Sequence, residues 1–380
     1  MNLSSPNFPP GKAAIFSGHG LPFELVTRDV PVLKQGEILV KILYTTLCGS
    51  DIHTYCGRRQ EPPNVVLGHE IVGEIIWIDP AHPHRDFRGE RIAVGDRITW
   101  SIFAVPEGAI APGADMPQKS NHLFKYGHAL ANGDDIFNGG LADYCILLAN
   151  TALIKISALI PLKVAATISC AHATVAGALR IAKNIRGKSV LIFGAGLLGL
   201  SCVAMCKEAG ASWIGITDID ERRSEWSQKF GANVIYPMNR SENGSLLWPE
   251  VDIVFDMTGN PHAMKTGIDS LAIGGVAIWI GAVFPAEPVA VDAQKVVRRL
   301  LQIRGLHNYN YDDFVNATTF IEKYFSKYPF EELVETEYTL DNIEAAFDFA
   351  VKEKPVRVGI KINEAINKPF SFIAGNNNNI

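Results

Sequence analysis

Two short segments of this chain have residue types and spacings that suit metal-assisted catalysis. They are Cys48-Gly-Ser-Asp-Ile-His53 and Gly68-His-Glu70. Both place side chains in loops between predicted strands, and thiol, imidazole and carboxylate groups are the ligands that zinc takes in catalytic sites. Each residue taken singly also has a plainer interpretation, with Cys48 as a small core residue and His69 as a satisfied loop histidine.

A glycine-rich turn, Gly194-Ala-Gly-Leu-Leu-Gly199, follows an apolar segment that ends at Phe193 and opens a predicted helix. Glycines there allow the backbone to approach a pyrophosphate, and the helix N-terminus supplies a positive field. Asp218 ends the next predicted strand, where it would bind the adenosine ribose and repel a 2′-phosphate, favouring NAD. Arg222 and Arg223 follow, and a cation there tolerates a phosphate, so NADP is the less favoured alternative. The predicted cofactor contacts are Gly194, Gly196, Leu197, Leu198, Gly199, Asp218 and Arg223.

These groups require two kinds of scaffold. Residues 12–100 contain short apolar runs such as 37–43 and 71–78, typical of strands, and residues 101–140 are loop-rich. From about residue 160, strands alternate with helices, which predicts an α/β fold with a parallel sheet covered by helices on both faces. The predicted helices are 161–182, 199–209 and 221–230, and the strands are 189–193, 213–217, 251–255 and 276–280. Two helical stretches and a strand at 356–362 follow, and the tail at 375–379 is predicted to be disordered.

Composition excludes several classes of function. The 380 residues are 47% hydrophobic and 20% charged, as in ordinary globular proteins, and this length favours two domains. A net charge of −5 without a basic run argues against nucleic-acid binding. The N-terminus shows no secretory signal, and the six cysteines form no disulfide framework. We therefore expect a cytoplasmic protein that does not bind membranes.

Across roughly residues 12–363 the chain resembles the medium-chain zinc-dependent alcohol dehydrogenases. The matching motifs are C-G-S-D-x-H, G-H-E-x-x-G, V-G-D-R at 94–97, the glycine turn with its acid, and Ser169-Cys-Ala-His-Ala-Thr174. The resemblance implies a β-rich GroES-like catalytic domain (1–171 and 306–380). It also implies a Rossmann nucleotide domain with a doubly wound parallel sheet (172–305).

The resemblance also implies a catalytic zinc site. Its ligands would be Cys48, His69 and Cys170, and Glu70 would be a carboxylate that transiently enters the coordination. Asp51 would orient His69 through its second ring nitrogen. Zinc held by two thiolates and one imidazole keeps an open position and lowers the pKa of a hydroxyl bound there.

Further residues would complete the dehydrogenase reaction. The resemblance implies that Ser50 and His53 relay the hydroxyl proton to solvent while hydride passes to the nicotinamide. Thr174 would contact the nicotinamide, and Arg357 would contact the pyrophosphate.

One departure from the family bears on the metal count. Many members bind a second, structural zinc through four cysteines in the lobe after V-G-D-R, but the corresponding positions here are Pro106, Ala109, Pro112 and Ser120. We expect one catalytic zinc per chain, no structural zinc, and a lobe held by turns and packing. Residues 79–89 look like an inserted loop.

The substrate cleft is predicted to accept an anion. Arg58 and Arg59 follow the first motif at a loop that borders the cleft in this family, and guanidinium groups pair with carboxylate or phosphate-like oxygens. The alternative is that both are solvated, or that one pairs with Glu61. Other cleft candidates, each with a structural alternative, are Lys125, Tyr126, His128 and His307 to Tyr309.

Four strings, at 57–59, 117–119, 122–128 and 303–309, are similar to a subgroup associated with phosphonate catabolism. Our hypothesis is a dehydrogenase that uses NAD(H) and a hydroxyalkylphosphonate or its aldehyde. The alternatives are a polyol, threonine-type or other neutral small-alcohol dehydrogenase, a zinc-free quinone reductase, and a decayed NAD-binding sensor or structural protein. We expect a homodimer or homotetramer, with 275–283 as the last nucleotide-domain strand and 288–291 extending the sheet across a dimer axis.

Overall fold

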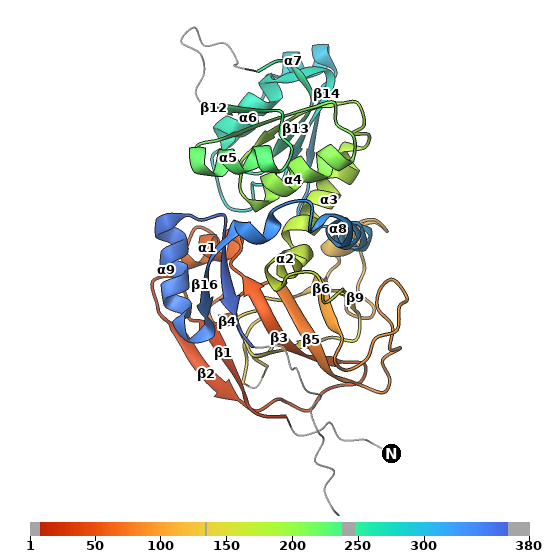
Figure 1. Ribbon diagram of the computed structural model, residues 1–380, viewed down its shortest axis with the longest axis vertical. Coiled ribbons are helices and arrows are strands. Elements are labelled where there is room, and N and C mark those ends of the chain that lie inside the picture. The colour runs from red at the N-terminus through yellow and green to blue at the C-terminus, as the bar shows by residue number, and fades with distance from the viewer. Residues whose placement is uncertain (1–7, 134, 238–247, 364–380) are drawn as a thin grey trace, which may run out of the picture.

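The computed structural model describes residues 8–133, 135–237 and 248–363. One part is built around a parallel sheet, and the other, below it in Figure 1, is rich in antiparallel strands. All strands of the parallel sheet lie between residues 189 and 305, and the segments on either side form the other part. The domain boundaries after residues 171 and 305 stay a proposal. The predicted disordered tail at 375–379 lies outside the described residues.

The parallel sheet has six strands in the order β12-β11-β10-β13-β14-β15. This order runs outward in both directions from β10, so the sheet is doubly wound and its switch point lies between β10 and β13. Ligands of such sheets bind at the carboxyl ends of the strands beside the switch point. The α/β fold class with a Rossmann sheet is therefore confirmed. The strands are β10 (Ser189–Phe193), β11 (Trp213–Asp218), β12 (Val234–Pro237), β13 (Val251–Asp256), β14 (Leu271–Trp279) and β15 (Gln302–Gly305).

Polar residues cap most helices of this part. Asp220 accepts a hydrogen bond from the Arg222 amide, Asn260 accepts from the amides of His262 and Ala263, and each begins its helix in this way. The helix after β10 is different, because its N-cap is Gly196 and no side chain caps its first amides. These N–H groups are left to bind an anion. The helices are α4 (Leu197–Glu208), α5 (Glu221–Lys229), α6 (Pro261–Asp269) and α7 (Ala293–Arg299).

The β-rich part contains an eight-stranded sheet and a three-stranded sheet. The larger runs β16-β17-β3-β5-β6-β7, with β8 paired to β3 and β9 to β6, and the smaller runs β2-β1-β4. The two apolar runs predicted as strands are here the central, largely buried β3 and β5. The strands are β1 (Gly11–Phe16), β2 (Phe23–Arg28), β3 (Ile38–Thr46), β4 (Val65–Val66), β5 (Glu70–Ile78), β6 (Arg97–Ala104), β7 (Phe124–Lys125), β8 (Tyr144–Leu147), β9 (Thr151–Lys155), β16 (Val334–Thr339) and β17 (Arg357–Lys361).

Helices α3 and α8 lie where the two parts meet (Figure 1) and pack against each other. Arg180 of α3 forms a bidentate ion pair with the buried Asp313 of α8, with N–O distances of 2.7 and 2.9 Å. The remaining helices are α1 (Gly49–Tyr55), α2 (Leu162–Ala165), α3 (Ala171–Ala182), α8 (Tyr311–Tyr324) and α9 (Ile343–Glu353). Four short 3₁₀ turns are η1 (Pro117–Lys119), η2 (Ala166–Ser169), η3 (Phe330–Leu333) and η4 (Leu340–Asn342).

Three sequence predictions differ from the structure. The helix predicted over 161–182 is broken into α2, η2 and α3, so Cys170 stands at a bend rather than inside a helix. The strand predicted over 275–283 ends at Trp279, and β15, not this strand, is the last of the sheet. Residues 288–291 form no strand.

No single helix among the described residues has the length and apolar character of a membrane span. The segments Leu162–Ser169 and Ala171–Ala182 have that length and apolar character only when taken together, and they are bent by 49° relative to each other.

Candidate active site

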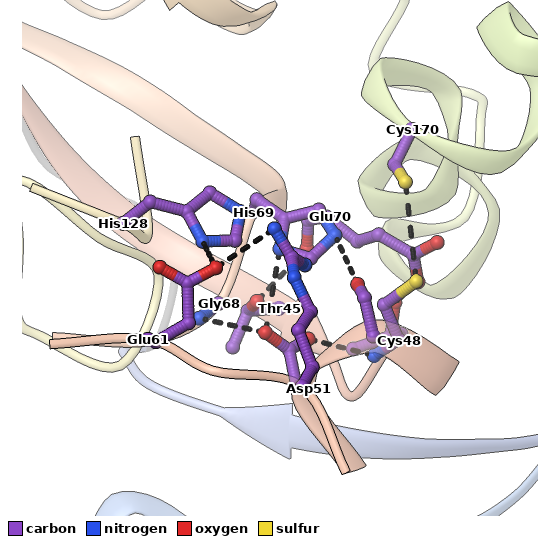
Figure 2. A network of polar contacts seen from close by, with 12 residues as sticks. Thr45, Cys48, Asp51, Glu61, Gly68, His69, Glu70, His128 and Cys170 are labelled. Atoms are coloured by element: carbon purple, nitrogen blue, oxygen red, sulfur yellow. Dashed lines mark hydrogen bonds and ion pairs between the residues drawn. The ribbon is translucent and has the colours of Figure 1, made fainter. Parts of the chain in front are cut away.

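Three predicted metal ligands converge from distant parts of the chain. Cys48 directly precedes α1, His69 directly precedes β5 and Cys170 directly precedes α3. One ligand atom from each lies within 4.8 Å of the others, and the two sulfur atoms are 3.9 Å apart, directed toward each other in Figure 2. A tetrahedral zinc with Zn–S bonds of about 2.3 Å requires sulfurs about 3.8 Å apart. The spacing therefore fits one zinc ion, and no other group of this kind occurs in the described part of the chain.

The buried Asp51 organises two of these ligands. Its Oδ2 accepts a hydrogen bond from the Cys48 amide at 2.9 Å, and its Oδ1 lies 3.3 Å from His69 Nδ1. The Gly68 amide donates a longer hydrogen bond, 3.4 Å, to Oδ1. Because Nδ1 faces a carboxylate, Nε2 is the ring nitrogen left for a metal ion.

The electrostatics of this group favour a thiolate at Cys48. The hydrogen bond from Cys170 lowers the pKa of the Cys48 thiol well below its ordinary value, against the opposing effect of burial. Charges on Arg357 and His69 act in the same direction. Burial lowers the pKa of His69, but Asp51 and Cys48 together raise it well above its usual value. A thiolate is the form of cysteine that binds zinc.

Ser50 and His53 line the cleft beside the three ligands. Ser50 Oγ lies 3.2 Å from His69 Nε2, which is the nitrogen that faces the metal position. His53 Nδ1 is buried, and none of the described residues forms a hydrogen bond with it. The ring of Phe284, from the loop after β14, packs over His53 at a centroid distance of 4.4 Å. The structure thus places both predicted relay residues at the site but does not join them by a direct hydrogen bond.

Glu70 and Arg357 form a buried ion pair. The Arg357 guanidinium donates to both Glu70 oxygens, at 3.0 and 3.1 Å, and the Thr46 hydroxyl also donates to the carboxylate. Burial raises the pKa of Glu70 to about 7, although the charge of Arg357 opposes this shift. Glu70 is outside the group of three ligands, so its predicted entry into the coordination requires a movement. Arg357 lines the cleft, where it contacts Glu70 and approaches Cys48 Sγ at 4.0 Å.

The predicted cofactor residues lie at the switch point of the sheet. The glycine turn connects β10 to α4, and its residues Gly194, Gly196, Leu197, Leu198 and Gly199 line the same cleft as the three metal ligands. A Cβ at Gly199 would lie 1.8 Å from the Gly194 carbonyl oxygen, whereas a Cβ at Gly196 would meet no atom within 4 Å. Gly199 therefore allows close packing within the turn, and Gly196 leaves open space for a ligand.

Asp218, Thr174 and Arg223 also line the cleft. Asp218 accepts hydrogen bonds from the Ala195 amide at 2.6 Å and the Asp220 amide at 2.9 Å, which hold it beside the turn. Arg223 donates to the carbonyl oxygen of Lys354 across the cleft. Arg222 instead pairs with Asp220 at 3.1 Å and is largely exposed.

The predicted substrate residues have different surroundings. Arg58, Arg59, Lys125 and His307 line the cleft, which has a volume of about 660 Å³, within the range of ligand sites. Arg59 pairs with Glu61 at 2.8 Å, as the structural alternative for it supposed.

His128 also lines the cleft, with its Nδ1 3.1 Å from Glu61 and its ring stacked 5.3 Å from that of His69 (Figure 2). Tyr126 and Tyr309 do not line it, because both are fully buried and direct their hydroxyls at core groups. The prediction that these two tyrosines line the cleft was therefore wrong.

The sequence did not predict the hydrogen bonds that hold the segment around Cys170 in place, which we call the Ser169 brace. The Ser169 hydroxyl donates to the His69 carbonyl at 3.0 Å, and the Ser169 carbonyl accepts a hydrogen bond from the Tyr309 hydroxyl. That hydroxyl also accepts from the Ile102 amide of β6 at 3.0 Å. The segment that carries Cys170 is thus fastened to His69 and to the β-rich part. Only the adjacency of Ser169 and Cys170 signalled this in the sequence.

The lobe that lacks the four cysteines is held by turn hydrogen bonds. The Ala109 amide donates to Pro106, and the Ser120 amide and hydroxyl donate to Pro117. The inserted segment 79–89 forms a loop of turns, in which Arg88 pairs with Glu322 at 2.8 Å.

Comparison with known families agrees with this geometry. The chain matches the alcohol dehydrogenase GroES-like domain over residues 34–158 and the zinc-binding dehydrogenase family over residues 198–323. The protein therefore belongs to the medium-chain zinc-dependent alcohol dehydrogenases and is an oxidoreductase of that class.

Two relatives are L-threonine 3-dehydrogenases. The chain is 27% identical to that of Shewanella frigidimarina over 85% of this chain and 92% of the relative. It is 30% identical to that of Aeromonas hydrophila over 73% and 79%, respectively. Among solved structures, an alcohol dehydrogenase from Thermotoga maritima shares the fold with a TM-score of 0.86 and 22% identity, covering 94% of this chain and 100% of the other. Benzyl alcohol dehydrogenase from Acinetobacter calcoaceticus gives a TM-score of 0.78 at 24% identity, with the same coverage.

Proposed function

We propose that this protein transfers hydride between NAD(H) and a small alcohol or aldehyde, with one zinc ion per chain held by Cys48, His69 and Cys170. The observation that carries this proposal is that the three ligands and the dinucleotide turn line one cleft. A zinc ion bound there would lower the pKa of a substrate hydroxyl, and NAD would accept the hydride.

The chain's own residues position the reactants and move the proton. Asp51 holds His69, and the uncapped amides of α4 receive the pyrophosphate. Asp218 faces the adenosine ribose and favours NAD over NADP, and Thr174 contacts the nicotinamide. Ser50 accepts the hydroxyl proton and passes it to His53, whose buried Nδ1 lacks another partner among the described residues.

This proposal can be tested by measuring the zinc content of the protein together with its rate of NAD reduction. We expect one tightly bound zinc per chain and NAD reduction with small alcohols, followed by the absorbance of the reduced cofactor. Cys170→Ser should lose both the zinc and the turnover but still bind NADH. NADH binding by a wild-type protein that holds no zinc would contradict the proposal and favour a decayed sensor.

For the substrate, we propose an anionic alcohol such as a hydroxyalkylphosphonate, because cations line the cleft. The second candidate is a threonine-type or other neutral alcohol, which the threonine dehydrogenase relatives favour. Turnover of 2-hydroxyethylphosphonate is to be compared with that of threonine and of neutral alcohols of similar size. Preference for the neutral substrates, unchanged by Arg58→Ala or Arg59→Ala, would support the second candidate.

We also propose that the protein is a homodimer or homotetramer. Strand β15 lies at the edge of the parallel sheet, and the nearby Val297 and Leu300 are 71% and 70% exposed. A second copy that covered this edge would pair its free hydrogen-bonding groups and bury the apolar side chains. Light scattering after size-exclusion chromatography measures the mass; a monomer at micromolar concentration would contradict the proposal.

A further inference from the structure

Positively charged side chains gather at the substrate end of the cleft. Burial lowers the pKa of Lys125, and the charges of Arg59 and Lys119 lower it further, while the charge of Glu61 opposes these effects. The three cations therefore lie close enough to repel one another. The acid that faces them is Glu61, and it is already engaged by Arg59 at 2.8 Å and by His128 at 3.1 Å.

Lys125 is a cleft cation that forms no ion pair in this arrangement, although the charge of Glu61 partly offsets the cations around it. Its side chain is half-buried, and no hydrogen bond or ion pair joins its ammonium group to any described residue. A partly buried ammonium among other cations is unfavourable unless an anion accompanies it. Because Lys125 lines the cleft, the ligand of that cleft is the available source of the anion.

Lys119 and His307 add two hydrogen-bond donors beside Lys125. His307 lines the cleft, and the exposed Lys119 lies outside the lining but contacts His307. Lys119 Nζ lies 2.6 Å from His307 Nδ1, and since an ammonium only donates hydrogen bonds, Nδ1 is the acceptor. The neutral ring then carries its proton on Nε2, which is a hydrogen-bond donor. The surrounding protein and the charges of Lys119 and Lys125 lower the pKa of His307 to about 4, so the ring stays neutral at physiological pH.

The cleft has room for a substituent beyond the reacting carbon. Arg59, Lys125 and His128 line both the main cleft and an adjoining cavity of about 340 Å³. Lys125 therefore lies where the cleft adjoins additional space, which could hold the remote end of a short substrate.

We infer that Lys119, Lys125 and His307 form a subsite for a tetrahedral dianion, the phosphonate or phosphate monoester group of the alcohol substrate. Two ammonium groups and one imidazole N–H match the three oxygens and double charge of such a group, whereas a single cation suffices for a carboxylate. The inference rests on the proposed function and moves the anion site from the Arg58–Arg59 pair to the lysines. Glu61 neutralises Arg59, and the charge of Arg58 acts on His53 rather than on Lys125 or His307.

Binding to the zinc- and NADH-loaded protein, measured by calorimetry, tests the subsite without requiring turnover. The probes are 2-hydroxyethylphosphonate, 2-hydroxyethyl phosphate, the monoanion 3-hydroxypropionate and neutral 1-propanol. We expect at least one dianion to bind about tenfold or more tightly than 3-hydroxypropionate, since charge-assisted hydrogen bonds are the strong ones. Tighter binding of the phosphonate identifies the phosphonate as the source, and tighter binding of the ester identifies a phosphate ester.

Matched lysine variants locate the subsite. Lys119→Met and Lys125→Met should each weaken dianion binding at least about tenfold, because Lys125 lines the cleft and Lys119 contacts the cleft residue His307. Lys207→Met, at an exposed position of α4, serves as the control, because Lys207 lines neither cavity and its side chain forms no hydrogen bond with a described residue that does. Equal binding of 3-hydroxypropionate and the dianions, or equal effects of all three variants, would overturn the inference. Tight dianion binding without turnover of any alcohol would contradict the proposed function and support the subsite. Turnover of 1-propanol without a preference for dianions would support the proposed function and overturn the subsite.

Discussion

Removal of the Tyr309 hydroxyl should loosen the metal site without touching a ligand. In the wild type this hydroxyl satisfies two buried backbone groups, the Ser169 carbonyl and the Ile102 amide. A buried polar group left unpaired destabilises a protein by about 1–3 kcal/mol. We therefore expect the free energy of unfolding of Tyr309→Phe to be lower than that of the wild type by about 1–3 kcal/mol.

Part of this loss should appear in zinc affinity. Folding of the wild type already orders the segment that carries Cys170, because Ser169 is fastened on both sides. In Tyr309→Phe, part of the free-energy cost of ordering this segment would fall on zinc binding instead of on folding. A cost of about 1.4 kcal/mol would weaken zinc binding about tenfold. Chelator competition measures the affinity, and the absorption of the cobalt-substituted protein reports the ligand geometry.

Tyr126→Phe is the matched control for this experiment. Tyr126 is also fully buried, and its hydroxyl hydrogen-bonds to the Leu148 amide and to Thr151, with no link to the metal ligands. It should lose similar stability yet keep wild-type zinc affinity and an unchanged cobalt spectrum. Equal zinc affinities in the two variants would refute the reasoning, because the Ser169 brace would then contribute to folding stability without ordering the zinc ligand Cys170.

Three further predictions concern the cofactor turn and the cleft. Gly199→Ala should destabilise the fold, since its Cβ would collide with a backbone oxygen, whereas Gly196→Ala should keep the wild-type Tm and bind NADH more weakly; wild-type NADH affinity in Gly196→Ala would contradict this. Asp218→Asn should narrow the preference for NAD over NADP by roughly tenfold, measured as the ratio of their kcat/KM values, and an unchanged ratio would remove Asp218 from cofactor selection. The folded-state pKa of His307, about 4, lies below its unfolded value of 6.5, so its contribution to stability is complete above pH 6.5 and is lost as the pH falls toward 4. The free energy of unfolding, measured with denaturant, should fall less between pH 7 and pH 5 in His307→Asn than in the wild type. Equal decreases in the two proteins would contradict the lowered pKa of His307.

Local patterns predicted much of the fold because each depends on residues close in the sequence. The strand at 189–193 was predicted with the bounds that the structure shows, since apolar runs act locally. The glycine turn was correctly predicted to open a helix, but that helix begins at Leu197, two residues before the predicted start at residue 199. The helix break before Cys170 was not predicted, because no proline or glycine marks it and the bend follows from hydrogen bonds of Ser169 to distant residues. Strand β15 was missed for a related reason, since a short, half-exposed edge strand has no apolar run.

By itself, the order of residues determined which side chains this protein has for chemistry: two thiols, an imidazole, a glycine turn and the acid at the end of the next strand. Tertiary structure decided how those side chains are paired. It placed the two sulfurs 3.9 Å apart, joined Arg59 to Glu61 and Glu70 to Arg357, and left Lys125 without an ion pair among the described residues. The physical reason is that ion pairs and metal ligation depend on distances of a few ångströms between residues far apart in the chain, which only the packing of the sheets and helices sets.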